Sequence, residues 1–442
     1  RRGGEPALRR YWDLAAVWQG RPRDGRCLEE IQEEFGDLLR RAVRQRLVSD
    51  VPLGAFLSGG LDSSTVVALM RQECPKVETF SIGFTEASYS ELPEARRTAA
   101  ALGVLHSDEV VRGDDPALLT EIASRLDEPF ADTSVVPTYV LCRMARRRVT
   151  VALSGDGGDE LLAGYVTHVA NVLRRRVRWL PRPVRAGLRR AMELVPDSRR
   201  KVSAVFKAKQ FLRGAELDAC DAHASWRLLA GPERVRRLLH PDLDINGFSP
   251  LGPYRGAFGE VPGLAPLDRF LYVDYRTWLP DDILVKADRA SMAHGLELRS
   301  PFLDHRLVEF CAGLPPELKL RGRRGKYLLR SFARGLVPDE VLRRKKAGFN
   351  APVSQWLAGP WRALLGDVLS PAELRREGLL NPEAVGRLVT EHLGGRRDHD
   401  LLLFYLLMLG LWLRHAGRPA PAGAACERRH DSPLPVPSNG AH

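Results

Sequence analysis

Between residues 53 and 153, short apolar segments alternate with helical segments, and this alternation limits the fold more than any other feature of the sequence. Strands separated by helices pair in parallel through right-handed crossovers, so the sequence predicts a doubly wound α/β sheet. The expected strands are 53–57, 77–84, 105–111 and 149–153. Helical periodicity predicts helices from residue 28 onward and over 61–70, 91–102, 115–126 and 138–147.

Beyond residue 161 the strand pattern fades, and residues 165–340 are expected to be mostly helical with proline-rich connections. The apolar segment 401–413 is too short to span a bilayer, which needs roughly 20 residues, and is expected to be a buried helix. The composition predicts three regions: a linker over 1–27, one folded domain over 28–415, and a disordered tail over 416–442.

The net charge of +12 leaves two interpretations open: an arginine-rich composition on an ordinary solvated surface, or an anionic partner such as a nucleic acid. The arginine clusters have no interleaved aromatic residues, which makes nucleic acid the less favoured partner. The cysteines are widely spaced, with no Cys-x-x-Cys pair. They are therefore expected to be free thiols in a reducing cytoplasm, and no apolar signal core or membrane segment is expected.

The strongest motif is Ser58-Gly59-Gly60-Leu61-Asp62-Ser63-Ser64, which lies between an expected strand and an expected helix. Glycines, hydroxyls and the positive end of a helix form a cradle for an anion. The carboxylate of Asp62 fits such a cradle if Mg²⁺ bridges it to phosphates. The alternative is an ordinary strand-to-helix turn capped by Asp62 or Ser63. The Gly-x₄-Gly-Lys-Ser/Thr loop of β,γ-cleaving nucleotide enzymes is absent.

A second motif, Ser154-Gly155-Asp156-Gly157-Gly158-Asp159-Glu160, directly follows the last expected strand. Its acidic residues predict an oxygen-rich rim suited to a hard cation. Taken alone, the motif is also compatible with an ordinary Gly/Asp turn. Because ligands bind at the carboxyl ends of parallel strands, two such loops at one sheet edge predict a single site.

The first motif resembles the pyrophosphate loop of the N-type ATP pyrophosphatases, and the two motifs together resemble the synthetase domain of the glutamine-dependent asparagine synthetases. The resemblance covers about residues 28–415. It implies a mainly parallel sheet of the adenine nucleotide alpha hydrolase-like type with a large helical C-terminal portion. Further blocks of the family pattern are Ser81–Phe84, Asp127–Phe130, Lys286–His294, Glu297–Asp304 and Lys345–Phe349.

The resemblance also implies roles for individual residues, with ATP as a substrate and Mg²⁺ as a cofactor. The metal would be held by Asp62 and Asp159. Asp156 would promote formation of the acyl-adenylate, and Lys326 would stabilise charge on the phosphates in the transition state. The adenine and ribose would be held at Leu57, Ile82, Ser154 and Gly155, and the pyrophosphate portion at Ser58, Gly60, Asp62, Ser63 and Ser64.

Without the resemblance, some of these residues have ordinary interpretations. Lys326 follows Arg323 and Arg324 and fits a solvated surface lysine. His294 and His305 are expected to be core or surface histidines, since amide formation here needs no histidine base. Asp288 and Arg289 are expected to form a structural ion pair that lines the crevice.

The leading functional hypothesis is an asparagine synthetase, in which aspartate and ATP form β-aspartyl-AMP and ammonia displaces AMP. The first alternative is the same adenylation chemistry on another carboxylate, as in β-lactam-forming, peptide-cyclising or metabolite- and sugar-amidating relatives. A tRNA-modifying pyrophosphatase is less favoured, and a purely structural role least of all.

The resemblance also concerns partners. Complete enzymes of the family begin with a glutaminase domain that has an amino-terminal cysteine, and Cys27 lies in the wrong context for it. We therefore expect either that an upstream glutaminase domain has been removed, which is consistent with a chain that starts at Arg1, or that the chain works alone with free ammonia or another amine. A homodimer is compatible with this interpretation.

Overall fold

The computed structural model describes residues 9–20, 24–130, 132–195, 204–243, 245–344 and 348–416. Outside this part of the chain lie residues 417–442 of the expected tail, which include Cys426, residues 1–8 and 21–23 of the expected linker, and Lys345–Ala347 of the last sequence block. No helix in the described ranges is long and apolar enough to cross a membrane.

A five-stranded parallel sheet is the centre of the fold, with the strand order β3-β2-β1-β4-β5. The prediction of a doubly wound α/β sheet is confirmed, because the chain starts in the middle of the sheet and the order reverses at β1. The strands are β1 (Leu53–Phe56), β2 (Glu78–Phe84), β3 (Leu105–Val111), β4 (Val151–Leu153) and β5 (Glu297–Arg299).

The fifth strand was not expected from the sequence. Strand β5 has only three residues, and it lies in a region that the sequence analysis assigned to helices. Leu298 of β5 pairs with Ala152 of β4. Pairing with this neighbouring strand, and not the local sequence propensity, therefore determines the conformation of β5.

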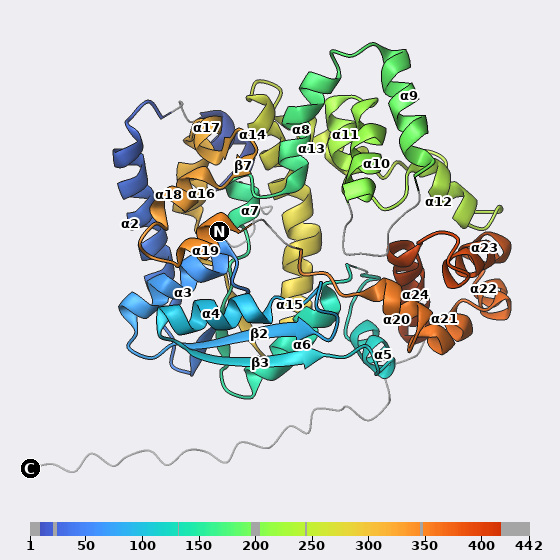
Figure 1. Ribbon diagram of the computed structural model, residues 1–442, viewed down its shortest axis with the longest axis horizontal. Coiled ribbons are helices and arrows are strands. Elements are labelled where there is room, and N and C mark those ends of the chain that lie inside the picture. Colours follow the sequence, from blue (N-terminus) through green and yellow to red (C-terminus); the bar gives the residue numbers. More distant parts are fainter. Residues whose placement is uncertain are drawn as a thin grey trace, which may run out of the picture.

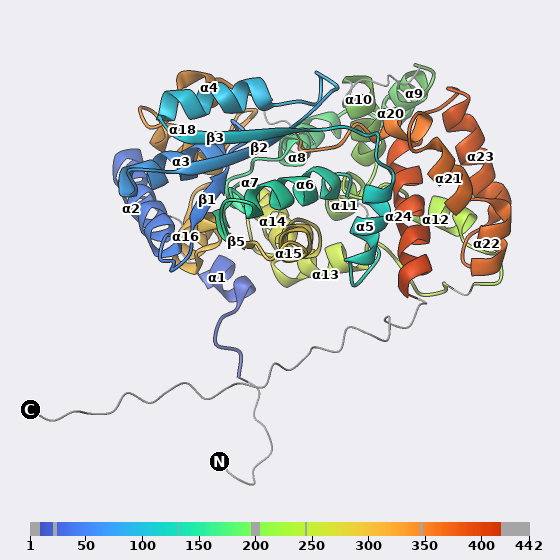
Figure 2. The same cartoon turned by 90° about the horizontal axis from the view of Figure 1, so that it is seen from below.

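Helices cover both faces of the sheet (Figures 1 and 2). Helix α3 contacts β1 and α4 contacts β2 on one face, with α2 outside α3, while α6 and α15 pack together on the other face. These helices and the neighbouring α5 are α2 (Leu28–Arg46), α3 (Leu61–Glu73), α4 (Leu92–Leu102), α5 (Ala117–Ser124), α6 (Val135–Arg146) and α15 (Val285–Met292).

The two faces carry separate hydrophobic cores, and the strands alternate between them. In β1, Ala55 packs with α2 and α3 in one core, whereas its neighbour Phe56 packs against the other core, which contains α5 and α6. This is the period-two alternation of strand side chains. Helix α2 shows the corresponding helical spacing, since the buried Ile31 and Phe35 are four residues apart.

The described part of residues 165–340 is mostly helical, as predicted, with β5 and a two-stranded antiparallel hairpin, β6 (Leu320–Arg321) and β7 (Arg324–Gly325), as its strands. The middle helices are α7 (Gly158–Leu161), α8 (Val166–Val177), α9 (Arg182–Glu193), α10 (Ala204–Ala215), α11 (Ala219–Ser225), α12 (Pro232–Leu238), α13 (Gly252–Glu260) and α14 (Pro266–Val273). A π-helical segment, Asp274–Leu284, joins α14 to α15.

The later helices begin with a short 3-10 turn at Pro301–Leu303 and end with α24, which confirms the buried helix expected over 401–413. Helices α20 to α24 form a helical group beside α5, at one end of the molecule (Figure 1). The later helices are α16 (His305–Gly313), α17 (Pro316–Lys319), α18 (Tyr327–Phe332), α19 (Asp339–Arg343), α20 (Val353–Ala358), α21 (Arg362–Val368), α22 (Pro371–Glu377), α23 (Pro382–Leu393) and α24 (Asp400–Ala416).

Part of the expected linker forms a packed helix, α1 (Leu14–Gly20). Trp18 is only 2% exposed and packs edge-on against Tyr272. The ammonium group of Lys319 lies 4.9 Å from the Trp18 ring centre and forms a 2.7 Å ion pair with Asp268. This cation–π contact attaches the N-terminal segment to the domain.

We predict that Phe80→Ala lowers the free energy of unfolding by about 3–5 kcal/mol, because it leaves a cavity beneath the sheet. Phe80 is 1% exposed in the central strand β2. Leu105→Ala on the edge strand β3 is the matched control, since Leu105 is 50% exposed. Urea unfolding followed by circular dichroism measures both changes. Equal unfolding midpoints for the two variants would contradict the placement of Phe80 in the core.

Candidate active site

The first predicted loop turns sharply between β1 and α3. Gly59 has φ of +66°, a backbone conformation that residues with a side chain rarely adopt, and a Cβ there would lie 3.0 Å from the backbone of Ala95. Gly60 is the N-terminal cap of α3. The loop thereby places the positive end of a 13-residue helix at the edge of the sheet.

The serines of this loop hold one another. The backbone N–H of Ser58 donates to Oγ of Ser63 at 3.2 Å, and the two hydroxyls lie 3.0 Å apart. Oγ of Ser64 is buried, and no described group forms a hydrogen bond with it. The loop is thus preorganised, with hydroxyl groups at the start of the helix.

The second predicted loop lies directly against the first, so the structure brings together the two motifs. A Cβ on Gly155 would be 2.9 Å from the Asp62 Cβ and from the backbone nitrogen of Ser63. A Cβ on Gly158 would be 2.9 Å from an Asp62 carboxylate oxygen. The glycines of the second loop are therefore required for this close approach, and not only for the turn.

Lys326 joins the two loops. Its side chain forms ion pairs with Asp62 and, at 2.5 Å, with Asp159. Lys326 is 4% exposed and has a left-handed backbone with φ of +57°, and its N–H donates to the carbonyl of Leu162 at 2.7 Å. The structure therefore places this lysine inside the site rather than on the solvated surface.

The backbone around Lys326 is packed closely. A Cβ on Gly164 would lie 1.8 Å from an Asp159 oxygen and 2.2 Å from Cε of Lys326. A Cβ on Gly325 would lie 2.0 Å from the carbonyl oxygen of Ala163. Glycine at position 164 thus leaves room for the Lys326 side chain, and glycine at position 325 leaves room for the neighbouring backbone.

Asp62 and Asp159 are also the two carboxylates that the sequence analysis assigned to a metal. The described residues contain no group of three or more His, Cys, Asp or Glu side chains that could hold a metal ion. Two carboxylates suit Mg²⁺, which is commonly bound by one or two carboxylates together with substrate phosphates and water. Asp62 and Asp159 both pair with the Lys326 ammonium group, so this position favours a cation. The two carboxylates therefore fit Mg²⁺ as ligands.

The three acidic residues of the second loop do not form one rim, which corrects the prediction. Asp156 accepts a 2.9 Å hydrogen bond from the Ser154 hydroxyl, whereas Glu160 is buried and accepts one from the hydroxyl of Tyr165. Burial and the adjacent Asp159 raise the pKa of Glu160 to about 7. The helical turn of α7 sends successive side chains in different directions, a property that the spacing alone did not reveal.

Of the residues expected at the adenine and ribose, Leu57 and Ser154 directly follow β1 and β4, whereas Ile82 lies within β2. Leu57 is 1% and Ile82 4% exposed, and their side chains pack in the two different cores. The N–H of Ser154 donates to the carbonyl of Arg299 at 2.9 Å. The side chains of Leu57 and Ile82 are therefore enclosed in the cores on opposite faces of the sheet.

Lys286 and its partners form a cluster that sequence reasoning missed. Nζ of Lys286 lies 3.0 Å from an Asp132 oxygen and 2.8 Å from Oγ of Ser134. Lys286 belongs to one of the sequence blocks of the family pattern, but its partners lie about 150 positions earlier in the sequence, at the start of α6. No periodicity or local spacing could have connected them.

A second missed feature is a buried polar network behind the second loop. Asp274 accepts hydrogen bonds from Arg227 at 2.6 Å and from His168 and His223 at 2.8 Å each. Burial alone would raise the pKa of Asp274, but these partners outweigh it and hold the pKa well below its usual range. Arg227 also stacks over Tyr165, which connects the network to Glu160.

The remaining candidates have ordinary contacts. Arg289 pairs with Asp288, as expected, and also with Asp127 at 2.6 Å. His294 packs 4.3 Å from the Tyr139 ring, and burial lowers its pKa. His305 begins helix α16.

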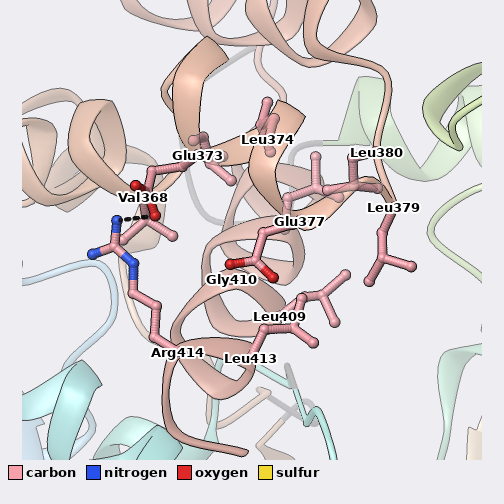
Figure 3. Close-up of a pocket in the computed structure, with 12 residues that line it drawn as sticks. Val368, Glu373, Leu374, Glu377, Leu379, Leu380, Leu409, Gly410, Leu413 and Arg414 are labelled. Carbon is pink, nitrogen blue, oxygen red and sulfur yellow. Dashed lines mark hydrogen bonds and ion pairs between the residues drawn. The ribbon is translucent and has the colours of Figure 1, made fainter. Parts of the chain in front are cut away.

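Two hollows lie away from this site. One of about 440 Å³ lies between α8, α14 and α17 and is lined by Asn171, Arg175, Phe270 and Glu317, among others. The other is small and apolar, between α22 and α24, with the Glu373–Arg414 ion pair at one side (Figure 3). Neither hollow contains a residue that the sequence analysis assigned to the site.

Comparison with known proteins gives a consistent family. Residues 34–414 match the family described as asparagine synthase. The chain is 31% identical over 389 residues to asparagine synthetase [glutamine-hydrolyzing] 1 of Bacillus subtilis, which covers 87% of this chain and 59% of that protein. A putative asparagine synthetase of Mycobacterium bovis is 35% identical over 387 residues, 86% of this chain and 57% of that protein. An amidase of Penicillium rubens, chyE, is 27% identical over 465 residues, 92% of this chain and 66% of that protein.

We predict that Gly164→Ala displaces Lys326 and weakens binding of Mg·ATP at least tenfold, while costing about 1–3 kcal/mol of stability from overpacking. The added methyl group would overlap the Asp159 carboxylate and Cε of Lys326. Gly187→Ala is the matched control, because a Cβ there meets nothing within 4 Å in helix α9. Equilibrium titration with a fluorescent ATP analogue measures binding, and unchanged affinity in Gly164→Ala would show that the packing around Lys326 is not required.

Proposed function

This chain belongs to the asparagine synthase family, and on that premise we propose that it activates a carboxylate with ATP and converts it to an amide. The proposed substrate is aspartate. Its β-carboxylate attacks the α-phosphate of ATP and releases pyrophosphate, and ammonia then displaces AMP from β-aspartyl-AMP to give asparagine. The chain spans 59% and 57% of the length of the first two relatives, so the complete reaction is proposed rather than taken from their names.

The observation that carries this proposal is the buried ammonium group of Lys326, held between the two loops by Asp62 and Asp159. Adenylation places negative charge on the α-phosphate and on the leaving pyrophosphate. A fixed ammonium beside the start of α3 stabilises such charge with little reorganisation. An arrangement of this kind serves no packing requirement, since burying a charged cluster costs free energy.

Other residues of the site have compatible roles in the proposal. The hydroxyl groups of Ser58, Ser63 and Ser64 at the start of α3 bind the pyrophosphate portion. Asp156, which accepts a hydrogen bond from the Ser154 hydroxyl, would promote formation of the acyl-adenylate. Asp62 and Asp159 would hold Mg²⁺, which when bound neutralises phosphate charge.

The ammonia source is part of the same proposal. The relatives from Bacillus subtilis and Mycobacterium bovis are named glutamine-hydrolyzing, so we propose that a glutaminase domain upstream of this chain supplies ammonia. A cytoplasmic location is supported by the described cysteines, which are all free thiols. The homodimer stays a prediction.

The proposal is tested by magnesium-dependent ATP–pyrophosphate exchange with a panel of carboxylic acids. Exchange that requires aspartate, followed by formation of asparagine and AMP when ammonia is added, is the expected result. Exchange with a different acid alone would support the adenylation chemistry but not aspartate as the substrate. The protein would then be an amide-forming enzyme that acts on another carboxylate. Pyrophosphate exchange with none of the acids would refute the proposed function.

We predict that Lys326→Met lowers the rate of exchange by roughly 10²–10³-fold, because the group that stabilises the developing phosphate charge is lost. Lys76→Met is the control, since Lys76 is exposed in the connection between α3 and β2. Thermal unfolding establishes that both variants are folded. A Lys326→Met rate within a few-fold of the unsubstituted chain would exclude a role in the chemical step.

A further inference from the structure

The positive charge of the chain is concentrated in one segment. Residues 174–201 contain eleven Arg or Lys and two Asp or Glu, so they carry a net charge of +9 out of the +12 of the whole chain. An arginine-rich composition on an ordinary solvated surface would distribute its charge along the sequence. The concentration therefore favours the other interpretation of the charge, an anionic partner that meets this segment.

The described part of this segment consists of the second half of α8, the connection 178–181, helix α9 and the two residues that follow it. Helix α9 lies at the periphery of the molecule, where it packs against α10 (Figures 1 and 2). None of the residues assigned to the candidate active site belongs to this segment. The segment is therefore available for a separate function.

Helix α9 packs on α10 through arginine side chains rather than apolar ones. Arg185 is 8% exposed, and its guanidinium group donates to the carbonyl of Ala215 at 3.4 Å. Arg189, one turn later, forms ion pairs with Glu193 at 3.0 Å and with Glu216 at 3.3 Å. A surface helix of a globular protein ordinarily turns its apolar side toward the core, so α9 is oriented the opposite way.

The apolar side chains of α9 consequently face the solvent. Val184 is 47% exposed and Leu188 is 45% exposed. Ala191 and Val195 are exposed as well, and the spacing of four, three and four residues places all of them on one side of the helix. Single exposed apolar residues are common on protein surfaces, whereas a stripe of them along one helix marks an interaction surface.

Cations and an indole border this stripe. Trp179, which precedes the helix, is 91% exposed, and Leu194 at its end is 86% exposed. Arg178, Arg182 and Arg190 are exposed, and none of them forms an ion pair with a described residue. The surface therefore combines unneutralised positive charge with exposed apolar area.

This combination distinguishes between the anionic partners. A nucleic acid would account for the arginines but not for the aliphatic stripe, and Trp179 is the only aromatic residue of 174–201 that could stack on a base. A second copy of the chain would bring two segments of charge +9 together, and these repel. An anionic bilayer matches both features, because phosphates attract the arginines while apolar side chains enter the boundary between head groups and acyl chains.

We propose that α9 and the connection 178–181 form a docking surface for an anionic phospholipid bilayer, on which the chain lies without crossing it. Val184, Leu188 and Val195 enter the boundary of the acyl chains, and the arginines beside them contact lipid phosphates. Trp179 takes the interfacial position that indole rings favour in membranes. The inference is independent of the proposed function.

The test is flotation of the purified chain with unilamellar vesicles in a density gradient. One set of vesicles contains phosphatidylcholine alone, and the other contains about one third phosphatidylglycerol. The expected result is binding to the anionic vesicles and not to the neutral ones, with a partition coefficient that falls as the salt concentration rises.

The contribution of the apolar stripe is measured without changing the charge. Val184→Gln combined with Leu188→Gln is expected to lower the partition coefficient onto anionic vesicles by about tenfold or more, because less apolar area leaves water on binding. Val48→Gln combined with Leu105→Gln is the matched control, since Val48 is 77% and Leu105 50% exposed outside this surface. The control is expected to bind as the unsubstituted chain does.

The contribution of the charge is measured in the same way. Arg182→Gln combined with Arg190→Gln is expected to lower the partition coefficient by about 10- to 30-fold, since two cations near the anionic surface are lost. Arg362→Gln combined with Arg375→Gln removes two exposed arginines from α21 and α22 and should have no effect. The thermal unfolding temperature should be unchanged in every variant, because all the substituted side chains are exposed.

Three results would overturn the inference. The first is equal binding to neutral and anionic vesicles. The second is anionic-vesicle binding that Val184→Gln with Leu188→Gln leaves unchanged, because charge alone would then account for it. The third is absence of vesicle binding, and arginine-dependent binding of tRNA or duplex DNA in that case would assign the surface to a nucleic acid.

Discussion

The buried ion pairs of Lys326 with Asp62 and Asp159 are the interaction on which the rest of the site depends. The three residues come from the start of α3, from α7 and from the end of the β6–β7 hairpin, which lie far apart in the sequence. A buried charge without partners would cost several kcal/mol, so each of these elements is confined to the position that satisfies the others. The close contacts at Gly155, Gly158, Gly164 and Gly325 follow from the same requirement.

Much of the fold could be predicted because its signals are local. The four strands from β1 to β4 and the helices between them have their own hydrophobic periodicity, and the two glycine-rich loops stand directly at strand ends. Strand β5 could not be predicted, since three residues carry no periodicity and their conformation depends on pairing with β4. The packed helix α1 was missed for a related reason: its burial depends on Tyr272 and Lys319, distant in the sequence.

The candidate site divides in the same way. Both loops could be found from residue types and spacing, and a resemblance pointed to Lys326. The directions of Asp156, Asp159 and Glu160 could not be found, because the turn of α7 separates side chains that are neighbours in the sequence. The Lys286 cluster and the Asp274 network were also out of reach, since each joins residues from helices that meet only in the folded chain.

The packing of Trp18 on Lys319 has a consequence for communication along the chain. Lys319 is the last residue of α17, and the β6–β7 hairpin that follows it ends next to Lys326. The N-terminal segment is thus anchored at the base of the same hairpin whose far end carries the ammonium group of the site. A movement of helix α1 would therefore be transmitted to the Lys326 ammonium group across a hairpin of a few residues.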